Sequence, residues 1–491
     1  RSRVGNAAAG GDRAPATYSR LSAILMTYER YIEAKLSGVP ATGIDRDVIL
    51  PSHGMFDHQR ALVSWACKRG RAAIFADTGL GKSRMQLAWA DAVLKHTSKP
   101  VLILAPLAVA PQTVAEGAEI GIRVRHCRDG SDIDPYESPG IAITNYDRLH
   151  RFDPSMFGAV VLDESSCIKH HDAKTLRTLL TAFRDTPFKL CATATPAPND
   201  WTELGTHAEF LGVCTRAEML AEYFTHDGGD TSVWRLKGHA RHVFWQWVSQ
   251  WGAMVRRPSD LGFDDSAYAL PPLHLHEHTV ETEMPLHGML FAAEAQTLSE
   301  RRDARRMSLT DRVRDCAAIV NDDAYEPWVV WCDLNAEGDA LTKAIRGAVQ
   351  IAGADPVEVK EQRLADFSAG RFRVLVSKPS ICGFGLNWQH AARMAFVGVT
   401  DSFESYYQAV RRCWRFGQRR DVHVHVFASS AEGAVVANLK RKERDATLMA
   451  ESLSAETRDA VMREVTGSKR HTNIHNAAQR VVVPHFLRET A

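Results

Sequence analysis

The sequence predicts an α/β protein with two tandem parallel sheets flanked by helices, and a helical insertion between them. Short apolar runs rich in Val, Ile, Leu and Ala alternate with amphipathic stretches. Runs with so little polar alternation are typical of strands buried on both faces, which belong to parallel sheets covered by helices. The runs form two series, separated by a different region at residues 215–320. A chain of 491 residues is long enough for about two to four domains.

Each series of apolar runs defines its own set of strands. The first series predicts strands at 72–77, 101–106, 141–146, 159–164 and 189–196, and the second at 328–333, 349–354, 373–378, 394–399 and 422–427. We therefore expect an N-terminal lead and helix at 1–50, a first α/β domain at 51–214, the insertion and a linker at 215–320, a second α/β domain at 321–446, and a helical tail at 447–491.

Composition excludes several classes of protein. The net charge of +1 excludes a histone-like polycation, although a locally basic cleft remains compatible with it. The nine cysteines contain no C-x-x-C pair, which argues against a zinc ribbon or a disulfide scaffold. No run of 18 apolar residues is present, and we expect no signal peptide in the printed sequence because its first residues lack an apolar core. We expect a location in the cytoplasm of a bacterial or phage-infected cell.

The stretch FADTGLGKS, Phe75–Ser83, predicts a phosphate-binding loop. It follows a predicted strand and precedes a predicted helix, where a Gly-rich turn presents backbone N–H groups to phosphate. In this interpretation Lys82 reaches the β- and γ-phosphates and the Ser83 hydroxyl holds Mg²⁺. Ala76 departs from the pattern G-x-x-x-x-G-K-[ST], which asks for glycine there. The alternative is a Gly-Lys-Ser turn without a ligand.

VVLDES, residues 160–165, is the second half of this expected site. An apolar strand that ends in Asp-Glu places two carboxylates at the carboxyl edge of a sheet. Asp163 would hold the Mg²⁺ shell and Glu164 would polarise the attacking water. Taken alone, the pair is equally compatible with a solvated strand end.

The pattern A-x-x-G-x-G-K-[ST] resembles motif I of the superfamily-2 helicases, and further motifs follow in the expected order. MFDHQRALVSW resembles their glutamine motif, APLAVAPQTV and ITNYD the next two motifs, DESS the D-E-x-x box, and TATP the motif that links the ATP site to the nucleic acid. The resemblance implies two RecA-like domains and the cofactors ATP and Mg²⁺. It implies coupling roles for Thr193 and Thr195, and nucleotide binding by Gln59, Thr78, Gly79, Leu80, Gly81, Lys82, Ser83 and Asp163, with Ser83 and Asp163 on the metal.

SYYQAVRRCWRFGQ, residues 405–418, resembles the Q-x-x-x-R-x-x-R motif of the same superfamily. The resemblance makes Gln408, Arg412 and Arg415 catalytic, beside Lys82 and the Asp-Glu pair. The two arginines would reach across the cleft between the domains, where guanidinium groups neutralise charge on the γ-phosphate. A basic amphipathic surface helix is the alternative.

Three features resemble the Swi/Snf-type translocase branch: the R-F-G-Q ending, the stretch GFGLN at 383–387, and Ile168-Lys169 after the Asp-Glu box. The chain as a whole resembles the compact members of this branch that phages encode. Gly383 and Gly385 would permit a close approach of the backbone to phosphate or nucleic acid. The chain departs from the family at Ser166, which replaces a histidine, and at Arg411, where Gly or Asp is common. Nucleic-acid contacts are expected at Pro106, Asn145, Tyr146, Lys378, Asn387 and Trp388.

The resemblance implies an enzyme that hydrolyses ATP to move along double-stranded DNA with little sequence preference. Two alternatives remain: a helicase that separates strands of forked DNA or RNA, and a scaffold subunit that uses ATP as a switch in a restriction or replication complex. Partner proteins in replication, recombination or restriction-modification are possible under each of these hypotheses.

Two further stretches attract a functional interpretation. LHLHEHTV places three histidines on one face of a strand, where they could bind Zn²⁺, although a solvated strand face is favoured. FWQWVSQWGAMVRRP combines tryptophans with Arg256 and Arg257, which could stack on exposed bases. The near-helical spacing of the aromatic residues favours a core helix.

Overall fold

The computed structural model describes residues 39–106, 109–133, 139–168, 174–197, 200–227, 230–280, 303, 305–382, 387–398 and 403–430, and residues 441, 444, 454, 458, 459, 461, 462 and 465. The helix expected at 18–36 and the glycines Gly383 and Gly385 lie outside these residues. Residues from Ala41 onward form one compact unit, and the description below concerns this unit.

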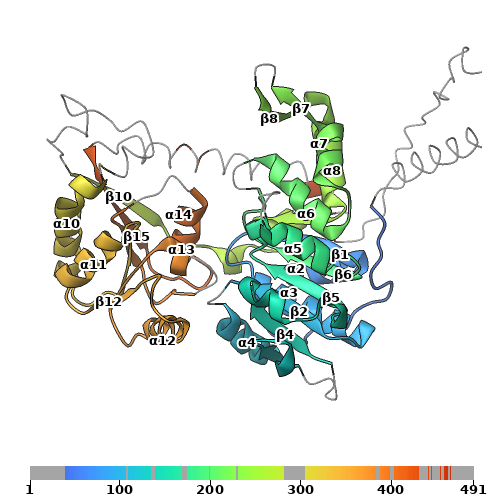
Figure 1. Cartoon of the computed structure of the whole chain (residues 1–491), viewed down its shortest axis with the longest axis horizontal. Helices are drawn as coiled ribbons and strands as arrows, with labels where there is room; N and C mark the ends of the chain where they lie inside the picture. The colour runs from blue at the N-terminus through green and yellow to red at the C-terminus, as the bar shows by residue number, and fades with distance from the viewer. Residues whose placement is uncertain are drawn as a thin grey trace, which may run out of the picture. The chain divides into compact units, whose positions relative to one another are not determined.

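The first sheet has seven strands, and all of its pairings are parallel (Figure 1). Their order is β3-β4-β2-β5-β6-β1-β9. The bounds are β1 Arg71–Ala76, β2 Val101–Ala105, β3 Val124–His126, β4 Ile141–Asn145, β5 Ala159–Asp163, β6 Phe188–Ala192 and β9 Gly252–Val255. Parallel strands place all their carboxyl ends at one edge, so the loops after β1 and β5 lie on the same side of the sheet.

Helices cover both faces of this sheet. One face packs on α2 (Asp57–Arg69), α3 (Lys82–Thr97) and α4 (Ala110–Glu119), whose apolar residues share one core with Ile74 and Ile103. On the other face the Phe75 ring meets His207 of α6 (Leu204–Leu211) and Trp251, which follows α8 (Arg241–Ser249). The remaining elements of this part are α5 (Lys174–Ala182), α7 (Arg216–Tyr223) and the antiparallel pair β7 (Phe224–Asp227) and β8 (Asp230–Leu236).

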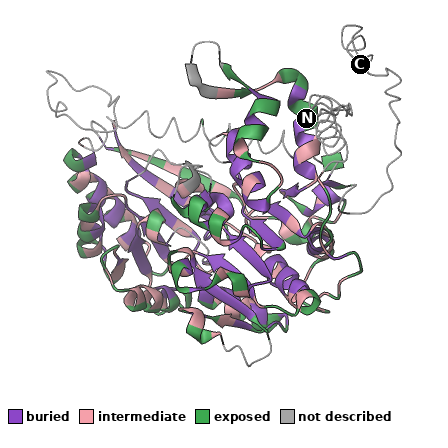
Figure 2. Cartoon of the chain, turned by 45° about the vertical axis from the view of Figure 1, so that its right-hand side comes forward, coloured by how far each residue is buried: buried purple, intermediate pink, exposed green. Residues whose placement is uncertain are grey.

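The second sheet has six parallel strands in the order β10-β15-β14-β11-β13-β12. The strands are β10 Leu273–Val280, β11 Trp328–Trp331, β12 Ala348–Ile351, β13 Val374–Ser377, β14 Arg393–Phe396 and β15 Val422–Ser429. Helices α10 (Leu309–Asp322) and α11 (Asn335–Ala344) pack on one face, and α12 (Val357–Ser368) and α14 (Phe403–Val410) on the other. The short α13 (Pro379–Cys382) follows β13. Figure 2 shows the strands of both sheets largely buried.

The predicted fold class is confirmed, and each of the ten predicted strands begins within one residue of its expected start, although several end earlier than expected. The region 215–320 differs from the helical insertion that the sequence predicts. It supplies β9 to one edge of the first sheet and β10 to one edge of the second. Strand β9 escapes prediction because its four apolar residues continue the aromatic run of α8, and periodicity cannot separate a short buried strand from a buried helix.

The aromatic segment packs in the core, as its spacing indicates. Trp245 and Trp251 are fully buried, and the Trp245 ring lies 4.2 Å from that of Trp201. The backbone N–H groups of Arg256 and Arg257 both donate to the Asp260 carboxylate. Trp245 and Trp251 are therefore core residues and are not available to stack on bases, whereas Trp247 is half-buried.

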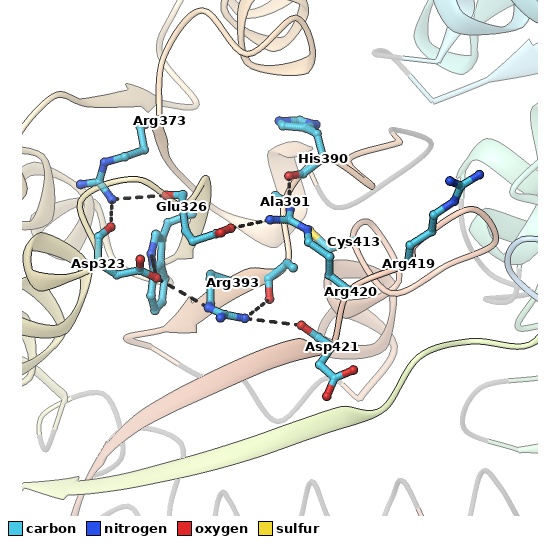
Figure 3. Close-up of polar contacts among 12 residues, drawn as sticks. Asp323, Glu326, Arg373, His390, Ala391, Arg393, Cys413, Arg419, Arg420 and Asp421 are labelled. Carbon is cyan, nitrogen blue, oxygen red and sulfur yellow. Dashed lines mark hydrogen bonds and ion pairs between the residues drawn. The ribbon is translucent and has the colours of Figure 1, made fainter.

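A network of arginines ties together the amino ends of the strands in the second sheet (Figure 3). Arg373, before β13, donates to the carbonyls of Asp323 and Glu326 in the turn that leads into β11. Arg420, before β15, forms an ion pair of 2.6 Å with the Glu326 carboxylate. Arg393 of β14 lies 3.6 Å from the Asp323 carboxylate. This edge of the sheet is thereby fixed by side chains, which leaves the carboxyl edge for a site.

Five histidines form a stacked ladder where β10 pairs with β15. His276 Nε2 lies 2.9 Å from His423 Nδ1, and His278 Nε2 lies 3.0 Å from His425 Nδ1. His274 lies 3.1 Å from the Asp421 carboxylate. Among the described residues, no group of three or more His, Cys, Asp or Glu has an arrangement that could hold a metal ion. The ring nitrogens hydrogen-bond each other instead.

We expect this ladder to make the protein sensitive to mild acid. Burial, together with the neighbouring imidazoles, lowers the pKa of His425 from 6.5 to about 4. The unfolded chain therefore binds a proton more readily than the folded one. The stabilisation is complete above pH 6.5, and it decreases as the pH falls from 6.5 towards 4. Urea unfolding midpoints across this range measure the slope. His425→Phe, which keeps a ring but removes the proton, should flatten it, and an unchanged slope would contradict the assignment.

We also expect a large loss of stability when a buried ion pair in the second lobe, the part of the chain built around the second sheet, is broken. Arg312 of α10 and Glu337 of α11 are fully buried, with Arg312 Nη2 2.9 Å from Glu337 Oε1. Glu337→Ala leaves an uncompensated guanidinium, which costs about 3–5 kcal/mol. The free energy of unfolding in urea measures the effect. Lys343→Ala, an exposed change on the same helix, is the control. Similar losses for the two variants would show that the pair does not stabilise the lobe.

None of the helices within the described part of the chain is long and apolar enough to span a membrane.

Candidate nucleotide-binding site

The phosphate loop lies between β1 and α3, as the sequence predicts. Gly79 and Gly81 have φ angles of 94° and 81°, in the left-handed region that favours glycine. A Cβ at Gly81 would also lie 2.3 Å from Gln59 Nε2. Ala76 is the last residue of β1 and has no positive φ, so it replaces glycine there without strain. The altered first position of the motif is thus compatible with the loop.

Lys82 begins α3 and points back over the loop. Its Nζ donates to the Ala76 carbonyl at 3.1 Å. Burial lowers the pKa of Lys82, and the nearby carboxylates of Glu164 and Asp77 act in the opposite direction. A buried ammonium at the N-terminus of a 16-residue helix is an arrangement suited to an anion.

Gln59 is placed against the same loop. Its side-chain amide donates to the Leu80 carbonyl at 2.8 Å, and its Oε1 accepts from the Phe56 N–H at 3.0 Å. The predicted glutamine motif therefore lies beside the predicted phosphate loop, although the two are separate in the sequence.

Asp163 and Glu164 follow β5 and face the same space as the loop. Asp163 Oδ1 accepts from the side-chain amide of Gln86 at 2.6 Å. Burial and the adjacent Glu164 carboxylate raise the pKa of Asp163. Glu164 has a φ of 49°, an uncommon conformation for a residue with a side chain. Strain of this kind is often concentrated at functional sites.

The Thr-Ala-Thr segment contacts Glu164. Thr193, which is fully buried after β6, donates from Oγ1 to Glu164 Oε2 at 3.3 Å. The Thr195 N–H donates to the Thr193 hydroxyl at 3.2 Å. Such a chain of contacts is what the expected coupling role requires. Ser165 lies 3.1 Å from His207 Nε2, so α6 also contacts the Asp-Glu box.

The predicted arginines of the second lobe face these groups. Arg412 is 2% exposed and donates from Nε to the Gln408 carbonyl and from Nη2 to Gln408 Oε1. Burial lowers the pKa of Arg412 to about 10, opposed mainly by the Glu164 carboxylate. Burial likewise lowers the pKa of Arg415, opposed by Glu116 and Glu164. Gln408 thus holds Arg412 in place.

These groups surround a single cavity of about 370 Å³, within the range of small-molecule sites. Residues of both lobes line it, including Gln59, Thr78, Gly79, Gly81, Lys82, Ser83, Asp163, Glu164, Asn387, Arg412 and Arg415. Leu80 contributes its backbone carbonyl to Gln59 and is not among the lining residues.

The expected nucleic-acid contacts are only partly compatible with the structure. Trp388 is a correction: it is fully buried, its indole N–H donates to Ser368, and it packs on Phe367. The sequence predicts a nucleic-acid contact because Trp388 follows a glycine-rich loop, but in the structure its ring packs in the core. Asn387 lines the cavity described above instead of a separate track.

Two other expected contacts serve the first lobe itself. The Tyr146 hydroxyl donates to the Asp163 carbonyl at 2.7 Å, and Asn145 Oδ1 accepts from the Arg148 N–H. These bonds position the end of β5 and cap the turn after β4. Pro106 and Lys378 remain partly exposed after β2 and β13.

Sequence reasoning missed several residues of the site. Gln86 lies one helical turn after Lys82, a spacing that could have indicated its contact with Asp163. Phe56, Tyr268 and Phe416 come together with ring centroids 4.9–6.0 Å apart beside the cavity. No spacing in the sequence connects these three rings, because they belong to three distant segments.

Two helix-covered parallel sheets, with a phosphate loop on one and paired arginines from the other, define a tandem RecA-like protein. Residues 327–417 match the helicase conserved C-terminal domain. This range runs from the start of β11 through Gln408, Arg412 and Arg415. The second lobe therefore matches a helicase C-terminal domain, in agreement with the resemblance that its sequence motifs indicate.

Two known proteins are similar to the chain over most of its length. Protein p41 of Acyrthosiphon pisum secondary endosymbiont phage 1 is 23% identical over 461 residues, covering 79% of this chain and 95% of p41. The SWI2/SNF2 ATPase core of Sulfolobus solfataricus, whose structure is of a complex with dsDNA, is 16% identical with a TM-score of 0.40, covering 86% of this chain and 99% of that one.

Proposed function

We propose that this helicase-type protein is an ATP-dependent motor that moves along double-stranded DNA. The observation that carries the proposal is the cavity where Lys82 and Glu164 of the first lobe meet Arg412 and Arg415 of the second. A pocket that only stores a nucleotide has less need of arginines from a second lobe, whereas hydrolysis benefits from them.

The residues that line the cavity suit ATP and Mg²⁺. The loop amides and Lys82 would hold the phosphates, while the Ser83 hydroxyl and the Asp163 carboxylate would hold Mg²⁺, which prefers oxygen ligands. Burial, together with the adjacent Glu164 carboxylate, raises the pKa of Asp163, and a divalent cation would neutralise the negative charge of this pair. Bound Mg²⁺ would supply charge neutralisation to the phosphates.

Glu164 is the residue that would orient the attacking water, and its bond from Thr193 fixes the carboxylate. Arg412 and Arg415 would stabilise the charge that develops on the transferred phosphoryl group. Because these groups belong to two lobes, binding and hydrolysis of a nucleotide in the cavity would change the contacts of both lobes. Contacts of this kind are required if hydrolysis is to drive movement of one lobe relative to the other.

Duplex DNA is the favoured track because the R-F-G-Q, G-F-G-L-N and Ile-Lys signatures are those of the Swi/Snf-type branch. The p41 relative is a phage protein, and the similar solved structure is of a complex with dsDNA. Contacts mainly to phosphates would give little sequence preference and a steep decrease of affinity with salt.

Steady-state phosphate release tests the proposal, measured with no polymer, duplex DNA, single-stranded DNA and RNA. We expect stimulation by duplex DNA and displacement of a third strand from a triplex. Stimulation by single strands or RNA, with displacement of a paired strand, would favour the unwinding helicase instead. Binding of ATP without multiple turnover under any condition would favour the switch subunit.

A further inference from the structure

A partly buried clasp joins the start of the phosphate loop to α14 and to the turn after it, which carries the paired arginines. The Tyr407 hydroxyl donates to Asp77 Oδ1 at 2.7 Å, and Arg411 Nη2 lies 3.1 Å from Asp77 Oδ2. The Thr78 N–H donates to Asp77 Oδ1 at 2.6 Å. Each oxygen of this carboxylate is therefore bonded to a residue of the second lobe.

The partners of Asp77 are themselves held firmly. The Arg411 guanidinium lies 4.6 Å from the Trp414 ring centroid and 5.1 Å from that of Tyr407. Arg411 is 8% exposed. Burial would raise the pKa of Asp77, but the Arg411 charge and the Tyr407 hydroxyl lower it below its ordinary value. A desolvated pair of this kind is difficult to break, because a lost partner leaves an unpaired buried charge.

The clasp lies next to the cavity but does not line it. Asp77, Tyr407 and Arg411 are not among the residues that line the cavity. Their immediate neighbours Thr78 and Arg412 are. The clasp therefore connects the two segments that face each other across the cavity.

We propose that Asp77, Tyr407 and Arg411 are positioning residues that hold Arg412 and Arg415 against the phosphate loop. This inference rests on the proposed function and adds to it. Arg411 occupies a position where the sequence departs from the helicase motif that it resembles, so the clasp gives that departure a role. Hydrolysis should depend on the clasp through the arginines, whereas binding of ATP should not.

A double-mutant cycle tests the clasp, using Asp77→Asn, Arg411→Gln and the double variant. We expect each single change to lower kcat about ten- to a hundredfold, with KM for ATP little changed and the double variant no worse than the worse single. In an Arg415→Ala background, Asp77→Asn should have no further effect. Tyr407→Phe, which removes only the hydroxyl, should be milder. Arg419→Gln, an exposed change on the same segment (Figure 3), is the control.

Effects that multiply in the double variant, or that persist in the Arg415→Ala background, would overturn the proposal. So would a loss of ATP binding that accompanies the loss of kcat, since that indicates a damaged loop. Amide hydrogen exchange without nucleotide provides a measurement that does not depend on turnover. Asp77→Asn should raise exchange in Phe403–Val410, and unchanged exchange there refutes the clasp. Absence of turnover in the wild-type protein would instead refute the proposed function.

Discussion

We expect the replacement of Lys82 by alanine to abolish the proposed ATP hydrolysis while the fold and the proposed DNA binding remain. Lys82 is the cation at the centre of the phosphate loop, surrounded by the carboxylates of Asp77, Asp163 and Glu164. Without it, these charges repel the phosphates, and we expect kcat to fall by about 10²–10³-fold or more. Phosphate release in the presence of duplex DNA measures the loss.

The matched control for this change is Lys95→Ala, on the solvent-exposed part of the same helix. Lys95 is exposed and pairs with Asp91 four residues earlier, so its loss should change stability by less than about 1 kcal/mol and leave turnover intact. ATP turnover that survives Lys82→Ala would refute the assignment of the loop. Loss of DNA binding in the same variant would mean that the change disturbs more than the nucleotide site.

Replacing Arg415 by alanine has the second large effect, and it acts on a different step. Arg415 is half-buried and lines the cavity together with Lys82, and the carboxylates of Glu116 and Glu164 favour its charged form. We expect kcat to fall about 10³–10⁵-fold, because an arginine finger contributes this much to phosphoryl transfer. The affinity for ATP should change far less, since the guanidinium acts on charge that develops during the reaction.

The two arginines can be separated by changing Gln408. The Gln408 side chain accepts a hydrogen bond from Arg412 through Oε1, and the Gln408 backbone carbonyl accepts a second one. Gln408→Ala should therefore give a smaller loss of kcat than Arg412→Ala, and no additional loss when the two are combined. A binding assay with a fluorescent ATP analogue, run beside the turnover assay, distinguishes loss of chemistry from loss of affinity. Equal losses of affinity and kcat for Arg415→Ala would contradict a finger role.

Much of the candidate site could be predicted because its residues lie in contiguous motifs. A loop such as Phe75–Ser83 requires glycine at positions with positive φ, and Gly79 and Gly81 have that conformation. Asp163 and Glu164 are recognisable because they end a strand buried on both faces. Motifs of this kind are defined by local backbone geometry, so they can be identified without knowledge of distant contacts.

The errors arise where the burial of one side chain depends on elements far away in the sequence. Trp388 was expected at a nucleic-acid surface, yet Phe367 and Trp331 enclose it. The stretch LHLHEHTV was expected to be a strand with a solvated face, but its partner could not be predicted, and β10 pairs with β15 along its full length. The alternating sequence pattern of a strand is the same whether the strand lies alone or pairs at the edge of a parallel sheet.

The sequence by itself determined the two α/β lobes, the phosphate loop, the Asp-Glu box and the paired arginines, since each depends on residues that are close along the chain. Only the tertiary structure showed which of these segments contact each other. Asp77 contacts Tyr407 across 330 residues, and no periodicity or composition encodes such a contact. Parallel pairing and lobe packing join segments that are remote in the chain, so the partners of a buried charge become known only when the fold is known.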